Sequence, residues 1–299
     1  MKNVIVTGAN GFIGSSLIKK MIGKNIHVLA IDINFDNSKL PESELITTLT
    51  VGLDDADVLF ESIPNGEYDA FYHLAWCGVN GPDKADPTVQ INNVLLAVNC
   101  ANAAKKHGCG RFLCAGTIAE QSVNSLGNLE KTGGGMMYGV AKQCTRLVIE
   151  TYCKNIDLKF VWMQFSNIYG PSNKTGNLVS YTVNELLNGR EASFGPAAQP
   201  YDFVYVDDLL EAVYRLGESE YRSNFYYIGS GSPRLLKEYL NTIGKIYGTP
   251  ELIRIGARAD DGIKYELSMF NNSSLVKDIG EYVTKSFEEG IRITIDAFK

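Results

Sequence analysis

The stretch Thr7-Gly8-Ala9-Asn10-Gly11-Phe12-Ile13-Gly14 decides the fold, because its three glycines join a short apolar run to a helical pattern. The preceding residues Val4–Thr7 predict a buried strand, and Gly14–Ile22 predict a helix. The first glycine permits a tight turn, the second lets a ligand approach the backbone, and the third allows the helix to pack closely on the strand. Since a helix N-terminus offers free N–H groups and a partial positive charge, the stretch predicts a site for the pyrophosphate of a dinucleotide.

The rest of the first half repeats this alternation of strand and helix. Near-continuous apolar strands separated by helical patterns are typical of a parallel sheet covered on both faces. We therefore expect an α/β fold with a doubly wound parallel (Rossmann) sheet and a smaller C-terminal α/β region. The predicted strands are His27–Ile33, Leu45–Val51, Ala70–Ala75, Arg111–Ala115 and Leu158–Phe165, and the predicted helices are Thr88–Lys106, Met137–Lys154 and Pro233–Ile246.

The order of elements changes after Tyr169-Gly170-Pro171, where shorter elements and more turns begin. This change divides the chain into a dinucleotide-binding domain, residues 1–170, and a substrate-binding region, residues 171–299. The division is expected to be discontinuous, because Asp202–Val206 and Asn224–Ile228 have the pattern of strands that return to the main sheet.

Composition excludes several classes of partner. The chain of 299 residues has a net charge of −6 and no dense cluster of lysines and arginines, which argues against nucleic acid. Its apolar runs are shorter than the roughly 20 residues that span a bilayer, so no membrane association is expected. A strand pattern begins directly at Met1–Val6, which predicts no signal peptide and a cytoplasmic location. The six cysteines lack metal-ligand spacing, so we expect reduced thiols and no metal site.

Asp32 ends the second predicted strand, about 20 residues after the glycine stretch. A carboxylate at this place accepts hydrogen bonds from the adenosine ribose hydroxyls of NAD and repels the 2′-phosphate of NADP. No arginine follows closely, and Lys39 is the nearest cation downstream. The pattern favours NAD(H) over NADP(H); the alternative interpretation is a solvated carboxylate at a strand end.

Tyr138 and Lys142 lie one helical turn apart in a predicted helix, so their side chains share a face. The ammonium group and the charge of an oxidised nicotinamide both stabilise phenolate, which would bring the pKa of Tyr138 down from near 10. Thr117 follows the strand Arg111–Ala115 at the carboxyl edge of the sheet, where its hydroxyl can bond a substrate oxygen. A tyrosine and a lysine at this spacing are, by themselves, more often an exposed pair.

With these motifs in order, the chain resembles the extended short-chain dehydrogenase/reductase family, in its NAD-dependent epimerase/dehydratase group of nucleotide-sugar enzymes. The resemblance spans nearly the whole chain. It rests on Thr7–Gly14, His73-Leu74-Ala75, Asn93-Val94 through Asn99, Arg111-Phe112-Leu113 with Thr117, Tyr138 with Lys142, Asn167–Pro171, Asp202–Asp208 and Gly229-Ser230-Gly231.

One branch of this family is the most similar, a branch of deoxysugar 4-ketoreductases and epimerases that includes CDP-abequose and paratose synthases. The segments Gly116–Glu120, Tyr201-Asp202-Phe203 and Ser286–Ile291 carry this likeness.

The resemblance implies roles for the matching residues. Thr117 would polarise the reacting oxygen, Tyr138 would transfer its proton, and Lys142 would lower the pKa of Tyr138 and bind the nicotinamide ribose. The residues implied in cofactor binding are Gly8, Asn10, Gly11, Phe12, Ile13, Asp32, Leu53, Leu74, Ala75, Asn93 and Lys142. Those implied in binding a sugar nucleotide are Asn167, Asn177, Leu178, Tyr201 and Arg258. Arg258 would clamp the diphosphate, with an ordinary surface arginine as the alternative.

The chain also departs from the family pattern. Val51-Gly52-Leu53 lacks the aspartate that touches adenine, so this contact falls to Leu53 and the neighbouring backbone. Tyr201 and Gln164 stand where arginines are usual. Ile118-Ala119 replaces the Asp-Glu pair of dehydratases, and Glu120 comes too late to replace it, which disfavours dehydration.

The expected activity is NAD(P)-dependent oxidation or reduction at C4 of a nucleotide-activated hexose. A 4-ketoreductase acting on a 4-keto-6-deoxyhexose is slightly preferred, and a 4-epimerase with tightly bound NAD is the alternative. A catalytically silent NAD-binding sensor is a third possibility, which the complete set of Thr117, Tyr138 and Lys142 disfavours. The helices Thr88–Lys106 and Met137–Lys154 resemble those of a four-helix dimer interface, which implies a homodimer.

Overall fold

A seven-stranded sheet forms the centre of the computed structural model, which describes residues 1–171, 173 and 176–299. The strand order is β11-β6-β5-β4-β1-β2-β3, and every neighbouring pair is parallel. The strands are β1 (Asn3–Thr7), β2 (His27–Asp32), β3 (Ile46–Thr50), β4 (Ala70–His73), β5 (Phe112–Thr117), β6 (Phe160–Phe165) and β11 (Phe225–Ile228). The chain reverses its direction of sheet growth between β1 and β4, which is where ligands bind in open sheets of this kind.

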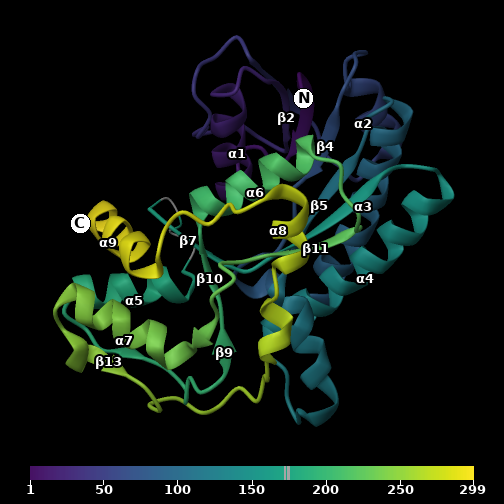
Figure 1. The fold of residues 1–299 in the computed structure, drawn as a ribbon. Helices are drawn as coiled ribbons and strands as arrows, with labels where there is room; N and C mark the ends of the chain where they lie inside the picture. The colour runs from purple at the N-terminus through teal and green to yellow at the C-terminus, as the bar shows by residue number, and fades with distance from the viewer. Residues whose placement is uncertain (172, 174–175) are drawn as a thin grey trace.

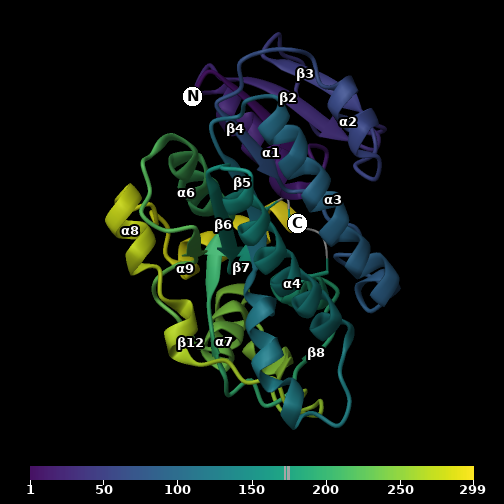
Figure 2. The ribbon, with the colours of Figure 1, turned by 90° about the vertical axis from the view of Figure 1, so that its right-hand side faces the viewer.

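Helices cover both faces of the sheet, as expected from the sequence. On one face α1 packs against α6, and on the other α3 packs against α2 and α4. Figure 2 shows α6 to the left of β5 and β6, with α3 and α4 to the right. These helices are α1 (Phe12–Ile22), α2 (Ala56–Ser62), α3 (Pro87–Lys106), α4 (Gly134–Asn155) and α6 (Val206–Glu218).

The two faces are built by alternation along each strand. In β1, Val4 and Val6 belong to the core under α1 and α6, whereas Ile5 belongs to the core under α2, α3 and α4. Such a strand is apolar at every position because both of its faces are buried. This confirms the expected doubly wound sheet.

Shorter elements make up the rest of the chain, and several gather at the lower left of Figure 1. They form three two-stranded sheets, β7 with β10, β9 with β12, and β8 with β13. The strands are β7 (Asn167–Tyr169), β8 (Ala192–Ser193), β9 (Pro200–Tyr201), β10 (Phe203–Tyr205), β12 (Arg234–Leu235) and β13 (Ile253–Arg254). The helices are α5 (Leu178–Leu187), α7 (Leu236–Tyr247), α8 (Ser273–Ile279) and α9 (Phe287–Phe298). The 3₁₀ helices are η1 (Pro82–Lys84), η2 (Ile118–Asn128), η3 (Pro250–Leu252) and η4 (Leu267–Phe270).

The two segments suspected of returning to the main sheet behave differently. Phe225–Ile228 forms its edge strand β11, which pairs with β6. Phe203–Tyr205 instead pairs with Asn167–Tyr169 in a sheet of two strands. The predicted helix Pro233–Ile246 starts later, at Leu236, because Arg234 and Leu235 pair with β9.

Within the described residues, no helix has the length and apolar character needed to cross a membrane. The same part of the chain holds no group of three or more histidine, cysteine or acidic side chains placed to bind a metal ion. All six cysteines are free thiols, and four of them are buried.

Candidate active site

A cavity of about 890 Å³ opens at the carboxyl edge of the sheet, where β1 and β4 lie side by side. One part of its wall is the glycine stretch after β1, with Asp32 at the end of β2. Thr117 and Tyr138 form another part, together with Asn167 and its neighbours. The fold therefore brings three distant segments of sequence to one cavity.

The glycine stretch forms the tight turn and close packing expected of it. Gly8 has a φ of +68°, and a Cβ there would lie 2.7 Å from the backbone nitrogen of Ala75. A Cβ on Gly14 would lie 2.1 Å from the carbonyl oxygen of Gly8, so α1 can pack on the turn only without that atom. Helix α1 begins directly after Gly11, and the glycine stretch at its N-terminus lines the cavity. This bare cradle fits a pyrophosphate.

Asp32 lines the cavity and also holds the glycine turn in place. Its carboxylate accepts hydrogen bonds from the backbone N–H groups of Asn10 and Ile33, both at 2.8 Å. The side-chain oxygen of Asn10 in turn accepts the N–H of Lys39 at 3.0 Å. The sequence predicted a ribose contact for Asp32. It did not predict the hydrogen bond between Asp32 and the glycine turn, because this bond depends on the pairing of β1 with β2.

The three side chains predicted to be catalytic line the same cavity. Tyr138 and Lys142 project from α4 into the cavity, opposite Thr117 at the end of β5. Lys142 is buried, and its ammonium group donates a hydrogen bond to the carbonyl oxygen of Ala115 at 2.7 Å. Burial lowers the pKa of Lys142, because the charged form is poorly solvated there.

The pKa of Tyr138 moves in the direction opposite to the one expected. Burial raises it most, the nearby carboxylate of Glu120 raises it further, and a hydrogen bond with the Thr117 hydroxyl partly offsets both. The expectation considered only the charges of Lys142 and the cofactor, and it left out the cost of burying a phenolate. The protein groups therefore favour the protonated form of this phenol.

Trp76 is a cavity residue that the sequence analysis missed. The Lys142 ammonium nitrogen lies 3.7 Å from the centre of its ring, and the Tyr138 ring meets it edge-on at 5.9 Å between centres. Its indole N–H donates to the side-chain oxygen of Gln90 at 3.0 Å. The signal was present, because Trp76 directly follows the Leu74-Ala75 pair of the cofactor motif.

Most of the predicted substrate residues line the same cavity. Asn167 accepts the Tyr201 hydroxyl at 3.0 Å and donates to the carbonyl oxygen of Asp202 at 3.0 Å. Asn177 caps helix α5 by accepting the N–H of Ser180. The predicted residues on the cavity wall are Gly8, Asn10, Gly11, Phe12, Ile13, Asp32, Leu53, Leu74, Ala75, Thr117, Tyr138, Lys142, Asn167, Asn177, Leu178 and Tyr201.

Asn93 and Arg258 do not lie among the lining residues. The Asn93 amide is buried behind the wall, where it accepts the N–H of Cys77 at 2.8 Å and donates to the Cys77 carbonyl at 3.0 Å. Its neighbour Asn92 faces the cavity instead. Arg258 is exposed on the segment after β13 and donates to the Tyr181 hydroxyl of α5 at 2.9 Å.

Glu120 also points away from the cavity. Its carboxylate accepts the N–H of Thr117 at 2.6 Å and hydrogen bonds from the side chains of Trp162 and Gln164 on β6. This orientation agrees with the expectation that Glu120 does not replace the acidic pair of dehydratases.

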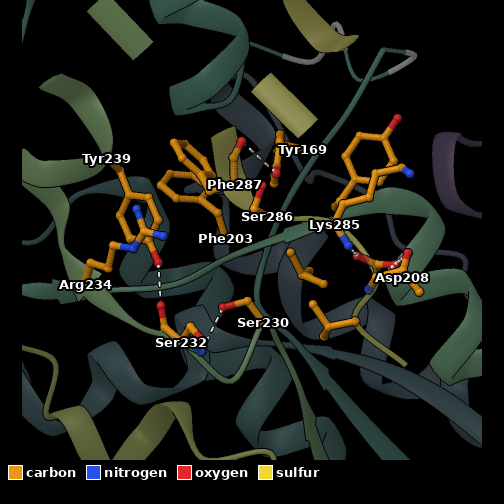
Figure 3. Close-up of a pocket in the computed structure, with 14 residues that line it drawn as sticks. Tyr169, Phe203, Asp208, Ser230, Ser232, Arg234, Tyr239, Lys285, Ser286 and Phe287 are labelled. Carbon is orange, nitrogen blue, oxygen red and sulfur yellow. Dashed lines mark hydrogen bonds between the residues drawn. The ribbon is translucent and has the colours of Figure 1, made fainter. Parts of the chain in front are cut away.

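Figure 3 shows a second cavity, of about 320 Å³, on the other side of Phe203. Arg234 and Lys285 lie on opposite sides of it. Its charged groups already have partners within the protein, since Arg234 pairs with Glu288 at 2.7 Å and Asp208 accepts bonds from the segment that contains Lys285. The larger cavity, which holds the reacting side chains, is therefore the candidate active site.

Comparison with known proteins identifies the family of the chain. Residues 4–229 match the NAD dependent epimerase/dehydratase family. CDP-abequose synthase of Salmonella muenchen is 23% identical over 303 residues, which cover 97% of this chain and 96% of that protein. dTDP-4-dehydro-6-deoxyglucose reductase of Escherichia coli is 24% identical over 253 residues, 80% of each protein.

Solved structures share the fold over its full length. UDP-glucose 4-epimerase of Thermotoga maritima, with UDP-glucose, has a TM-score of 0.82 at 22% identity and covers 99% of this chain and 98% of its own. The Bordetella bronchiseptica enzyme WbmG, in complex with NAD, has a TM-score of 0.80 at 20% identity. The match covers 99% of this chain and 93% of the WbmG chain. The matches confirm the predicted class, an NAD-dependent enzyme of the extended short-chain dehydrogenase/reductase group. The family match covers most of the chain, which therefore belongs to the NAD-dependent epimerase/dehydratase family.

Proposed function

We propose that the protein is a 4-ketoreductase that acts on a nucleotide-activated 4-keto-6-deoxyhexose. The observation that carries the proposal is the placement of the Tyr138 phenol on the cavity wall together with Thr117 and Lys142. Reduction of a ketone requires a proton donor at the developing alkoxide, and a neutral phenol supplies one.

The side chains divide the work as follows. The Thr117 hydroxyl donates a hydrogen bond to the C4 oxygen and holds it next to Tyr138. Tyr138 gives its proton to that oxygen as negative charge develops on it, and Lys142 stabilises the resulting phenolate. The glycine stretch and Asp32 would hold NADH, which would supply the hydride for C4 when bound. The phenolate then recovers a proton from water, which balances the reaction.

The preference for NADH rests on Asp32, whose carboxylate lies on the cavity wall at the end of β2. Ribose hydroxyls can donate to it, whereas a 2′-phosphate would meet its negative charge. Leu53 lines the same end of the cavity and offers an apolar surface to adenine.

The sugar nucleotide is proposed to lie along Asn167, Tyr201, Asn177 and Leu178, which continue the cavity beyond Tyr138. Arg258 is the proposed clamp for its diphosphate. The guanidinium contacts Tyr181, one turn along α5 from the cavity residue Leu178.

The relatives support a reduction at C4. One of them is named dTDP-4-dehydro-6-deoxyglucose reductase, and two are named CDP-abequose synthase.

A 4-epimerase is the second candidate, and the NAD preference indicated by Asp32 favours it. An epimerase holds NAD through a complete oxidation and reduction, whereas a reductase releases the oxidised cofactor after each turnover. The purified protein should therefore be denatured and the released NAD measured. Stoichiometric NAD would reject the reductase in favour of the epimerase.

The direct test uses nucleotide-activated 4-keto-6-deoxyhexoses with different bases. We expect loss of NADH absorbance with at least one of them, and none with Tyr138→Phe as the matched control. If no compound of the panel is turned over, and no UDP-hexose reacts in an epimerase assay, the result would favour a catalytically silent NAD-binding sensor.

A homodimer in the cytoplasm completes the proposal. Helices α3 and α4 pack together and expose apolar side chains, Ile91 and Leu95 on α3 and Leu147 and Val148 on α4. An exposed apolar patch of this kind is typical of a subunit interface.

A further inference from the structure

A buried carboxylate lies directly behind the reacting side chains. Glu120, on η2, is 3% exposed. It accepts three kinds of donor, the backbone N–H of Thr117 at 2.6 Å, the indole N–H of Trp162 at 3.1 Å and the amide of Gln164 at 3.1 Å. Trp162 and Gln164 belong to β6, so the carboxylate joins the Thr117 backbone to the neighbouring strand.

These contacts show the state in which the carboxyl group is held. All three partners are donors, which match an ionised carboxylate and leave no acceptor for a carboxylic proton. The pKa of Glu120 is raised, because the effect of burial exceeds the lowering by its hydrogen-bond donors and by the charge of Lys142. A buried anion is tolerated where donors and an opposite charge compensate its lost hydration.

Lys142 provides that opposite charge. Its side chain is 4% exposed, and its ammonium group donates to the Ala115 carbonyl rather than to Glu120. The two charges therefore act on each other at a distance, through an interior where screening by water is weak.

We propose that Glu120 is a positioning residue of the active site, whose carboxylate fixes the Thr117 backbone to β6 and provides the buried negative charge that keeps Lys142 charged. The assignment to an active site rests on the proposed function. Glu120 itself touches no reacting atom, so it acts through Thr117 and Lys142.

The titratable groups that face Glu120 come from two elements. Helix α4 contributes Lys142 and Tyr138, and strand β5 contributes Cys114, each of which is affected by the charge of Glu120. Strand β6 contributes only the uncharged side chains of Trp162 and Gln164. A negative charge raises the pKa of all three titratable groups, so its removal should lower them.

The test uses the two tryptophans as internal reporters. The Lys142 ammonium nitrogen lies 3.7 Å from the ring centre of Trp76 and 6.0 Å from that of Trp162, so loss of its charge changes their environment. Tryptophan emission is followed as the pH rises, without substrate or cofactor, in the wild type and in Glu120→Gln, Glu120→Asp and Lys142→Met. Glu130→Gln, which neutralises an exposed carboxylate just beyond η2, is the matched control.

We expect a transition that is absent in Lys142→Met. Its midpoint should fall by about one pH unit in Glu120→Gln, by less in Glu120→Asp, which keeps the charge, and not at all in Glu130→Gln. Equal midpoints in the wild type and Glu120→Gln would overturn the proposal. Should Glu120→Gln fail to fold, an unchanged midpoint in Glu120→Asp would do the same.

A denaturation cycle decides the case in which no Lys142-dependent transition is resolved. Lys142→Met should destabilise the wild type more than it destabilises Glu120→Gln, because it leaves Glu120 unpaired only in the former. Additive losses would reject the proposal. Neither measurement involves turnover, so failure of the proposed function and failure of this inference are distinguishable.

Discussion

The phenol of Tyr138 is the group on which the proposed chemistry depends. We expect Tyr138→Phe to reduce turnover by about 10²-fold or more, because the variant keeps the ring and loses the proton. Affinity for NADH should stay near the wild-type value, since the hydroxyl is not part of the glycine cradle. Steady-state kinetics and cofactor titration check both statements, and retained turnover would reject Tyr138 as the acid.

Asp32 should select between the two nicotinamide cofactors. Asp32→Ala removes both the proposed ribose contact and the bond to the Asn10 N–H, so binding of NADH should weaken. NADPH should lose less, because the repulsion of its 2′-phosphate disappears at the same time. Asp36→Ala, an exposed carboxylate in the following loop, is the control and should change neither affinity. Equal losses for the two cofactors in Asp32→Ala would refute the ribose assignment.

The sequence indicated which side chains share the cavity better than it indicated what holds them. The helical spacing of Tyr138 and Lys142 placed both on one face of α4, because this spacing depends only on local geometry. The contact of Trp76 with Lys142 and the bonds of Glu120 with β6 depend on how separate elements pack. The pKa of Tyr138 was expected to fall because the helical spacing does not show how far the phenol is buried by other elements.

At the scale of elements, the turn between β1 and α1 has little room for an added side chain. A Cβ on Gly14 would lie 2.1 Å from the Gly8 carbonyl oxygen, so Gly14→Ala must displace the helix. We expect a loss of about 1–3 kcal/mol in the free energy of unfolding, together with weaker NADH binding.

Gly23, at the C-terminal end of the same helix, provides the control. Its φ is −62°, and an added Cβ would lie 3.4 Å from the nearest atom, the Lys20 carbonyl oxygen. Gly23→Ala should therefore change stability by less than about 0.5 kcal/mol. Chemical denaturation of both variants measures the difference, and equal stabilities would contradict the close packing of α1.

Elements with strong periodic patterns were predicted closely, and short ones were not. Val4–Thr7 and Thr88–Lys106 match β1 and α3, because an apolar strand and a long helix have distinct patterns. The helix Ala56–Ser62 was missed because it is two turns long and buries one residue, Leu59. Strand β10 was expected in the main sheet, but its partner β7 is chosen by tertiary packing.

At the scale of the molecule, one edge of the sheet accounts for the placement of the site. Parallel strands direct all their carboxyl ends to the same side, so the glycine turn after β1 and Thr117 at the end of β5 share one cavity. The shorter elements after residue 170 supply Asn177 and Tyr201 to the same cavity. The segments proposed to bind cofactor and substrate can therefore line one cavity although they are far apart in the sequence.

The exposed apolar faces of α3 and α4 lead to a prediction about assembly. We expect the wild-type protein to scatter light as a dimer of its 32.9 kDa chain at micromolar concentration, through these two helices. Leu95→Glu and Leu147→Glu place a charge on side chains that are each 52% exposed, and either should shift the mass to that of a monomer. Leu267→Glu, on η4 and 61% exposed, is the matched control and should remain dimeric. The interface assignment fails if the wild type is a monomer or if the control dissociates as readily as the two helix variants.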